Sequence, residues 1–369
     1  MAPQSTLPPL DPVYYPAAVQ PQEITASLTR SAIFLIVTLK PGTEAAAAVQ
    51  EVLANVSGLV RATGFRRPES TMSCVTSIGA HAWGRLFPGP RPRELQPFEA
   101  IHGVHVAPST PGDILFHIRA DDRDMCFEFE SSLLAQLGGN VTVVDETPGF
   151  KFFDDRDLLG FVDGTENPNG AAREAAVVIG DEDPVFKGGS YVITQKYLHD
   201  LDKWNALTTE RQEEIIGRKK LSDLELADNV KKSYAHNVLN VITDADGNQL
   251  QILRDNMPFG RPASGEFGTY FIGYARSPSR TILMLRRMFI GAPEGNYDRI
   301  LDVSTPVTGT LFFTPTADML DACGTPDAAP EPEDAPEDAP GDATRDAPVA
   351  APADPDQSAS LGIGSLKGR

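Results

Sequence analysis

The order of apolar segments between Ser31 and Val144 constrains the fold more than any other feature of this sequence. Apolar, β-branched runs of strand length alternate with helix-length stretches, and pairs such as Pro41-Gly42 separate them. The order strand, helix, strand, strand, helix, strand predicts a ferredoxin-like α+β unit. Its strands are expected at Ser31–Leu39, Met72–Ile78, Ile114–Ala120 and Val141–Val144, and its helices at Thr43–Leu59 and Asp121–Gln136.

A similar order begins again after residue 188. The 369 residues are enough for two domains of ordinary size, so the pattern predicts two similar α+β units. The expected elements are strands Gly189–Gln195 and Gly268–Tyr274, helices Asp200–Ile216 and Ser279–Phe289, and a hairpin of Val238–Ile242 with Gln249–Leu253.

Charge and cysteine usage exclude several classes of protein. The formal charge of −19 argues against nucleic-acid binding, which needs basic surface. Three separated cysteines without a CxxC pair indicate neither a disulfide framework nor a zinc site, and they fit a reducing cytoplasm. We expect no export signal at the N-terminus and no membrane span, because no run approaches ~18 apolar residues.

The segment Gly160–Pro168, with the sequence GFVDGTENP, is the strongest candidate for chemistry. Asp163 stands between an apolar pair and Gly164, and Asp-Gly is typical of a tight turn. A carboxyl group held by a turn and backed by Phe161 and Val162 is a candidate for proton transfer. The alternative is an ordinary surface turn.

Three separated motifs carry a family resemblance. GFVDGTENP, Ala235–Val238 (AHNV) and Ile252–Gly260 (ILRDNMPFG) occur in the order that resembles bacterial B-type dye-decolorising haem peroxidases. The resemblance covers about Ser31 to Asp318. It implies two ferredoxin-like domains that form a dimeric α+β barrel-like core, with one haem b per chain held by the second domain.

The resemblance also implies roles for individual residues. His236 matches the proximal ligand of the haem iron, and Asp298, rather than Asp302, resembles the acceptor of its second N–H. Arg218 resembles a residue that contacts a haem propionate, with a solvated helix end as the alternative. Phe271 is expected to line the distal pocket.

On the distal side, peroxide needs a proton acceptor and a nearby positive charge. Asp163 is expected to move the proton, and Arg254 to supply a fixed charge, unless it forms a surface ion pair with Asp255. Asn256 is predicted on the same strand face as Arg254, two residues on. Candidate electron relays to bulky donors are Trp83, Trp204, Tyr191, Tyr234 and Tyr270, and Glu225 is a candidate Mn(II) ligand.

The C-terminal tail has a different character. Residues 325–357 hold eight prolines and ten acids, a composition that predicts a disordered linker. The last ten residues, SLGIGSLKGR, resemble the targeting peptide of encapsulin cargo proteins. That resemblance implies that Leu361, Ile363 and Leu366 dock into an apolar groove on the inner wall of the shell.

These observations predict a haem peroxidase that reduces H₂O₂ and oxidises dyes, phenolic compounds or Mn(II). It is expected in the cytoplasm inside an encapsulin compartment, as a homo-oligomer for which the resemblance favours a hexamer. A haem-binding or haem-handling protein is the alternative. The predicted divisions are an arm at 1–29, domains at 30–150 and 151–323, a linker at 324–358 and the targeting peptide at 359–369.

Overall fold

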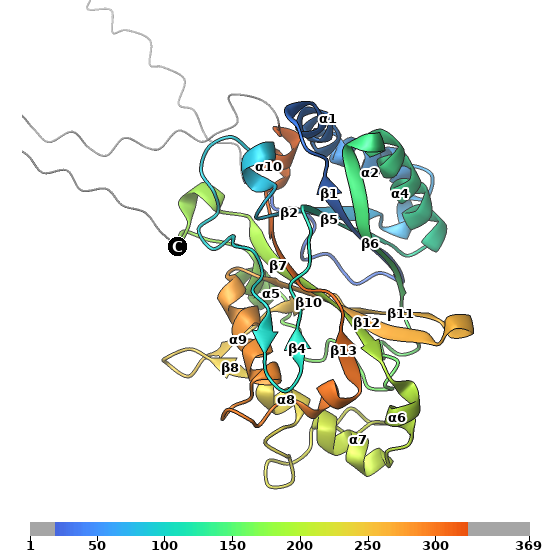
Figure 1. The fold of residues 1–369 in the computed structure, drawn as a ribbon, viewed down its shortest axis with the longest axis vertical. Coiled ribbons are helices and arrows are strands. Elements are labelled where there is room, and N and C mark those ends of the chain that lie inside the picture. Colours follow the sequence, from blue (N-terminus) through green and yellow to red (C-terminus); the bar gives the residue numbers. More distant parts are fainter. Residues whose placement is uncertain (1–18, 324–369) are drawn as a thin grey trace, which may run out of the picture. The chain divides into compact units, whose positions relative to one another are not determined.

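A computed structural model describes residues 19–323 of the chain. Its main feature is one ten-stranded sheet to which two α+β units contribute (Figure 1). The predicted α+β class, with two ferredoxin-like units in a barrel-like core, is confirmed.

The first unit follows the predicted order. Its four strands pair antiparallel in the order β2-β5-β1-β6, which is the strand order of a ferredoxin-like fold. Helices α1, α2 and α4 lie together over one face of these strands (Figure 1). The elements are β1 (Ser31–Leu39), α1 (Thr43–Ala54), α2 (Val56–Gly64), β2 (Ser73–Gly79), β5 (Ile114–Ala120), α4 (Arg123–Leu137) and β6 (Val141–Phe150).

The second unit repeats this strand order. Its strands pair as β10-β12-β7-β14, and β11 continues the pairing of β10 along β12. Its elements are β7 (Ser190–His199), α6 (Leu201–Asn205), α7 (Thr209–Ile216), α8 (His236–Leu239), β10 (Leu253–Arg254), β11 (Met257–Arg261), β12 (Glu266–Ala275), α9 (Pro278–Phe289) and β14 (Thr310–Thr314).

The two units join at two places, one within the sheet and one between its two edges. Strand β14 pairs with β2, so the strands of the units form one continuous ladder. At the second place β6 lies against β11, where a Cβ on Gly149 would approach the Cβ of Met257 to 2.7 Å. The sheet therefore curls toward closure and buries the strand faces that look inward.

Smaller elements complete the fold. They are α3 (Trp83–Leu86), β3 (Ile101–His102), β4 (Val106–Ala107), α5 (Ala171–Val177), β8 (Ile242–Thr243), β9 (Gln249–Leu250), β13 (Ser304–Pro306), α10 (Ala317–Asp321) and the 3₁₀ turns Pro68–Ser70, Gly138–Asn140, Pro184–Phe186, Pro262–Ser264 and Arg299–Asp302.

Three expected elements differ in the structure. The helix predicted from Thr43 breaks at Asn55, and the helix predicted at Asp200–Ile216 is two helices, because Thr208 caps a new one by accepting a hydrogen bond from the Arg211 amide. The expected hairpin shrinks to β8 and β9, since residues 236–239 are helical. The strand beside β12 is instead β10 with β11.

The described part of the N-terminal arm packs on its own chain. The Gln22 side chain donates to the carbonyls of Thr76 and Pro315 at 2.8 Å and accepts from the Thr76 amide at 2.8 Å. Residues 1–18 lie outside the described range. Within residues 19–323, none of the helices combines the length and apolar character needed to cross a membrane.

Candidate cofactor site

A large cavity lies in the second unit. It encloses about 910 Å³ of atom-free space, part of it open to solvent, and its lining comes from β7, β12, α8, α9 and residues 157–163. An adjoining pocket of about 690 Å³ shares several of its wall residues, including His236 and Arg254. Apolar side chains supply much of the wall: Phe271 of β12, Met284, Leu285 and Met288 of α9, and Ile252, which precedes β10.

His236 lines this cavity at the start of α8. Its Nδ1 lies 2.7 Å from Oδ2 of Asp298, whose side chain is fully buried. Burial lowers the pKa of His236, but the charge and hydrogen bond of Asp298 outweigh burial and leave that pKa raised. The pairing fixes the ring and leaves Nε2 for the cavity. The predicted partner Asp298 is therefore the one in contact, whereas Asp302 accepts from Tyr297 at 2.8 Å.

Arg254 and Asn256 also line the cavity. Strands β10 and β11 pair with β12 in a single register, Arg254 opposite Gly273 and Met257 opposite Tyr270, so the chain stays extended across the interruption between them. Alternate side chains then point the same way, as predicted. The Asn256 Oδ1 accepts from the Ile272 amide at 3.1 Å, which turns its Nδ2 toward the Asp163 carboxylate at 3.1 and 3.3 Å.

The segment Gly160–Pro168 is fastened to this strand by Asn167. The Asn167 Nδ2 donates to the Arg254 carbonyl at 2.7 Å, and its Oδ1 accepts from the Arg254 amide at 2.9 Å. The side-chain amide of Asn167 thus makes the two hydrogen bonds with the Arg254 backbone that a neighbouring strand would otherwise make. The Asp163 amide donates to the Asp155 carbonyl at 2.8 Å, which holds the other side of the turn. Together these bonds place Asp163 beside Arg254 and Asn256.

The surface ion pair considered for Arg254 is absent. Asp255 points to the opposite face of the strand, where its Oδ2 accepts from Nη1 of Arg119 at 2.7 Å. Burial lowers the pKa of Arg254, and the carboxylates of Asp163 and Glu166 oppose that shift. The ordinary pKa of a guanidinium lies far above neutral pH. Arg254 therefore stays charged at neutral pH and presents a fixed positive charge to the cavity.

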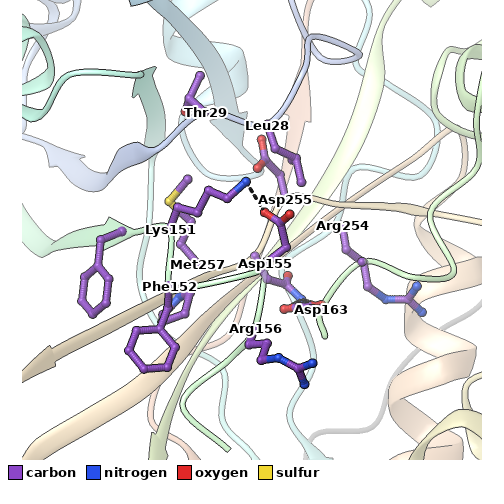
Figure 2. A pocket seen from close by; sticks show the side chains of 14 residues that line it. Leu28, Thr29, Lys151, Phe152, Asp155, Arg156, Asp163, Arg254, Asp255 and Met257 are labelled. Atoms are coloured by element: carbon purple, nitrogen blue, oxygen red, sulfur yellow. Dashed lines mark hydrogen bonds and ion pairs between the residues drawn. The ribbon is translucent and has the colours of Figure 1, made fainter. Parts of the chain in front are cut away.

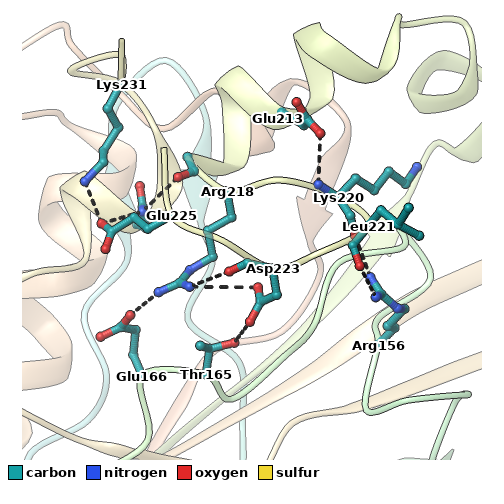
Figure 3. Close-up of polar contacts among 12 residues, drawn as sticks. Arg156, Thr165, Glu166, Glu213, Arg218, Lys220, Leu221, Asp223, Glu225 and Lys231 are labelled. Atoms are coloured by element: carbon teal, nitrogen blue, oxygen red, sulfur yellow. Dashed lines mark hydrogen bonds and ion pairs between the residues drawn. The ribbon is translucent and has the colours of Figure 1, made fainter. Parts of the chain in front are cut away.

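Arg218 lies at the margin of the adjoining pocket within a polar network (Figure 3). Its guanidinium pairs with Glu166 and donates to the Asp223 carbonyl at 3.0 Å. Nearby Glu225 pairs with Lys231 at 2.5 Å. Across residues 19–323 we find no group of three or more His, Cys, Asp or Glu side chains placed to hold a metal ion.

A second, smaller pocket reaches the same residues from another direction. It encloses about 430 Å³, and its lining includes Asp163 and Arg254 (Figure 2) together with Asn256. Lys151 and Asp155 form a 2.6 Å ion pair beside it (Figure 2). Asp163 and Asn256 therefore stand between this pocket and the large cavity.

Asp157 and His199 are among the residues of the cavity wall that were not expected from the sequence. Asp157 accepts from the Phe161 amide at 3.0 Å, and burial, reinforced by Asp163, raises its pKa to about 7. His199 bonds Thr269 at 2.9 Å and Ser304 at 2.8 Å, and burial lowers its pKa to about 4. Asp157 stands only three residues before the motif, so its position was the one available signal. The relay candidates Trp83, Trp204, Tyr191, Tyr234 and Tyr270 do not line this cavity.

The residues fit a haem. An imidazole with a buried carboxylate behind it, an apolar wall and a cation at the margin match the needs of an iron porphyrin with propionates. The fold and this site define an α+β enzyme with an internal cofactor cavity.

The comparisons with known proteins agree. Residues 21–151 match the N-terminal model of the Dyp-type peroxidases, and residues 154–319 match the C-terminal model. The chain belongs to the Dyp-type peroxidase family. The expected enzyme class, a peroxidase, is confirmed, and the haem-handling alternative is not favoured.

Its relatives cover nearly the whole described chain. A dye-decolorizing peroxidase of Mycolicibacterium paratuberculosis is 55% identical over 351 residues, or 95% of this chain and 93% of the relative. DyPB from Rhodococcus jostii RHA1 superimposes with a TM-score of 0.81 at 50% identity, covering 84% of this chain and 99% of that one. The encapsulated DyP-type peroxidase from Mycobacterium smegmatis gives a TM-score of 0.81 at 59% identity, covering 82% and 98%. Variants of the R. jostii protein have been solved with heme and with manganese.

Proposed function

We propose that this chain is a haem b peroxidase in which His236 binds the iron and Asp163, Asn256 and Arg254 handle the peroxide. The observation that carries the proposal is one cavity that holds a carboxylate-backed imidazole together with a carboxylate, an amide and a half-buried guanidinium. Structures of R. jostii DypB variants with heme support the choice of cofactor.

On the proximal side, the Asp298 carboxylate keeps the proton of His236 on Nδ1. This leaves the Nε2 lone pair free to coordinate and makes the imidazole a stronger donor. Bound haem would supply the two-electron reduction of H₂O₂ and the one-electron oxidation of donors. Arg218 is proposed to hold a propionate, and Phe271 to line the distal space.

On the distal side, Asp163 is proposed to accept a proton from the incoming peroxide and to return it to the departing oxygen. Asn256 holds the carboxylate in place with its own amide. Arg254 stabilises negative charge on the oxygens, because a partly desolvated cation acts more strongly than a fully solvated one. The smaller pocket that these three residues help to line is the proposed entry for peroxide.

The proposed reducing substrates are dyes and phenolic compounds, with Mn(II) as a third candidate. The complex of a R. jostii DypB variant with manganese supports Mn(II). Glu225 and Glu166 lie near the pocket margin, where an ion could be held once their present pairing with Lys231 and Arg218 is broken.

We further propose that the chain is encapsulin cargo in the cytoplasm. The encapsulated peroxidase of M. smegmatis is a close relative and supports this assignment. Leu361, Ile363 and Leu366 lie outside the described residues, as do the proposed linker 324–358 and peptide 359–369. A homo-oligomer, favoured as a hexamer, would present several peptides to one shell and gain avidity. The divisions 1–29, 30–150 and 151–323 are retained as part of the proposal.

The visible spectrum of protein expressed with ample haem tests the cofactor assignment. We expect a Soret band that is lost in His236→Ala and kept in His102→Ala, which alters an exposed histidine outside the cavity. A Soret band of unchanged position and intensity in His236→Ala would refute the assignment of the ligand.

Co-expression with the shell tests the packaging. Truncation after Ser358 is expected to leave peroxidase activity intact and to abolish co-purification with the shell. Replacement of Leu361, Ile363 and Leu366 by Asp should do the same, whereas replacement of Ser360 and Ser365 by Ala should not. Undiminished packaging of the truncated protein would sink this part of the proposal.

A further inference from the structure

A fully buried polar cluster lies behind the strand that carries Arg254 and Asn256, on the face opposite to the cavity. Asp255, between Arg254 and Asn256, accepts from Arg119, and its carboxylate lies 3.7 Å from Nε2 of His117. The other ring nitrogen of His117, Nδ1, lies 3.0 Å from the Tyr274 hydroxyl. The side chains of His117, Arg119 and Tyr274 are 0% exposed, and Asp255 is 2% exposed. Such a cluster in an apolar core is costly, so it requires an explanation.

The charges around His117 determine where its proton lies. Burial lowers the pKa of His117 to about 3, so the ring is neutral and carries one proton. A carboxylate attracts an N–H, and Asp255 faces Nε2, so the proton belongs on Nε2. The lone pair of Nδ1 then accepts from the Tyr274 O–H. The polar groups are thus arranged in the order phenol, imidazole and carboxylate, and the Arg119 guanidinium pairs with the carboxylate.

This order equips Tyr274 to lose an electron. A phenol that loses an electron becomes a very strong acid, and its oxidation is favourable only where a base receives the proton. His117 is such a base in direct contact, and Asp255 stabilises the imidazolium that would form. Arg119 balances the carboxylate, so the cluster stays near neutrality before the step.

Two other buried tyrosines provide an internal contrast. Tyr197 lines the cavity itself, but its hydroxyl donates to Oε1 of Gln195 at 2.7 Å, and an amide oxygen does not take up the proton. Tyr270 lies on the same face of β12 as Tyr274, but its hydroxyl makes no hydrogen bond of sound geometry to a described residue, although Asp145 and Thr194 lie close enough to influence its pKa. Only Tyr274 of these three has a neutral imidazole as acceptor.

Tyr274 is also close to the cavity. Its backbone pairs with Leu253, next to Arg254, and the same strand carries Thr269 and Phe271 on the cavity side. An electron moving between the cavity and Tyr274 therefore crosses a single sheet.

We propose that Tyr274 is a redox site that donates one electron to the oxidised cofactor while its phenolic proton moves to Nδ1 of His117. The O–H bond of the phenol breaks and an N–H bond forms on the imidazole. The tyrosine becomes a neutral phenoxyl radical, the ring becomes an imidazolium facing Asp255, and the cofactor is reduced by one equivalent. The proposal rests on the haem peroxidase function, which supplies the oxidant.

The test is freeze-quench electron paramagnetic resonance of the haem-loaded protein mixed with H₂O₂ without a reducing substrate. Ring-deuterated tyrosine should narrow the radical signal and so identify it as tyrosyl. We expect Tyr274→Phe to abolish the signal and Tyr270→Phe, which changes a buried tyrosine outside the cavity, to keep it. His117→Gln, which retains an acceptor but no base, should slow formation of the radical by at least about 10²-fold, the lower end of what a positioned base contributes to the rate of proton transfer.

A measurement on the unmodified protein guards against variants that fail to fold. After exchange into D₂O, electron–nuclear double resonance of the wild-type radical should detect an exchangeable deuteron. This deuteron is bound to Nδ1 of His117 and forms a hydrogen bond to the phenoxyl oxygen. A wild-type signal without that deuteron, a signal that survives in Tyr274→Phe, or the absence of any tyrosyl signal overturns the proposal. The optical response to H₂O₂ is recorded in the same samples. A protein that reacts normally with H₂O₂ without a tyrosyl signal refutes the redox site alone, whereas a protein with no optical response refutes the peroxidase function.

Discussion

The two ferredoxin-like units share a strand order but use the space between sheet and helices differently. In the first unit α4 packs on β1 and β5, and Val49, Leu53, Phe116, Phe129 and Leu133 are buried in one hydrophobic core. In the second unit the same layer contains the cavity, with Phe271 of β12 and Met284 of α9 on its walls. The topology therefore does not decide whether the layer is a core or a site.

The connections explain the difference. In the first unit residues 40–72 leave β1, form α1 and α2 over the sheet and return as β2. In the second unit residues 200–252 form only short helices between β7 and β10, and the last of them, α8, brings His236 to the cavity. A helix long enough to cover the sheet is thus replaced by segments that border a space.

Matched truncations of one phenylalanine in each unit give the largest expected effect. Phe129→Ala in the filled layer should lower the free energy of unfolding of the apoprotein by about 3–5 kcal/mol, because it opens a new cavity. Phe271→Ala should cost clearly less, since its ring already borders empty space. Denaturant unfolding of both apoproteins measures the difference. Equal losses would show that the second layer is as tightly packed as the first.

Removing the Arg254 guanidinium should have the next largest effect. Arg254→Leu is expected to slow the reaction of the haem-loaded protein with H₂O₂ by about 10²–10³-fold, or about 2.7–4 kcal/mol, which is typical of losing one preorganised electrostatic group. Arg261→Leu, an exposed arginine at the end of the adjoining strand β11, is the control. Stopped-flow mixing gives the rate constants. A wild-type rate in Arg254→Leu would remove Arg254 from the proposed chemistry.

The sequence predicted the units and several of the cavity residues because their signals are local. Strand periodicity identified Ser31–Leu39 and Ile114–Ala120 with the bounds that the structure has. The motifs identified His236, Asp163 and Arg254, and period-two alternation placed Asn256 with Arg254. Asp298 was predicted through the resemblance, although 62 residues separate it from His236.

The features that escaped prediction depend on contacts between distant segments. The clamp of Asn167 on Arg254 joins residues 87 positions apart, and nothing in an Asn-Pro pair indicates its partner. His117 was one histidine among six in the sequence, and its role depends on a tyrosine 157 residues away. The pairing of β14 with β2 likewise arises only when both units are folded.

The pH dependence of haem retention probes the proximal side of the second unit. Iron needs a neutral imidazole, so protonation of His236 competes with binding, and affinity should fall as the pH drops through the raised pKa of His236. In Asp298→Asn the charge that raises this pKa is removed while burial remains. The midpoint of haem loss should therefore move to lower pH, by about one to three units. Soret absorbance across a pH series measures the midpoint.

The pairing of His236 with Asp298 also determines how the stability of the apoprotein changes with pH. Because the pKa of His236 is raised on folding, its pairing with Asp298 stabilises the apoprotein below the unfolded pKa of about 6.5 and is lost as the pH rises through the folded pKa. Asp298→Asn should therefore destabilise the apoprotein more at pH 5 than at pH 9. The opposite trend would show that the pair is not ionised in the folded apoprotein.

The smallest expected effect tests whether the distal residues of the second unit are positioned by the turn that borders the cavity. Asn167→Ala removes two hydrogen bonds to the Arg254 backbone and should cost about 1–3 kcal/mol of stability, at about 0.5–1.5 kcal/mol for each bond. The rate of reaction with H₂O₂ should also fall, because Asn167 no longer joins the turn that carries Asp163 to the backbone of Arg254. Asn169→Ala, an exposed asparagine two residues away, is the control and should match wild type. An Asn167→Ala variant that is less stable but reacts with H₂O₂ at the wild-type rate would show that the strand alone places Arg254. The second unit would then position its residues by its own strands, as the first unit does.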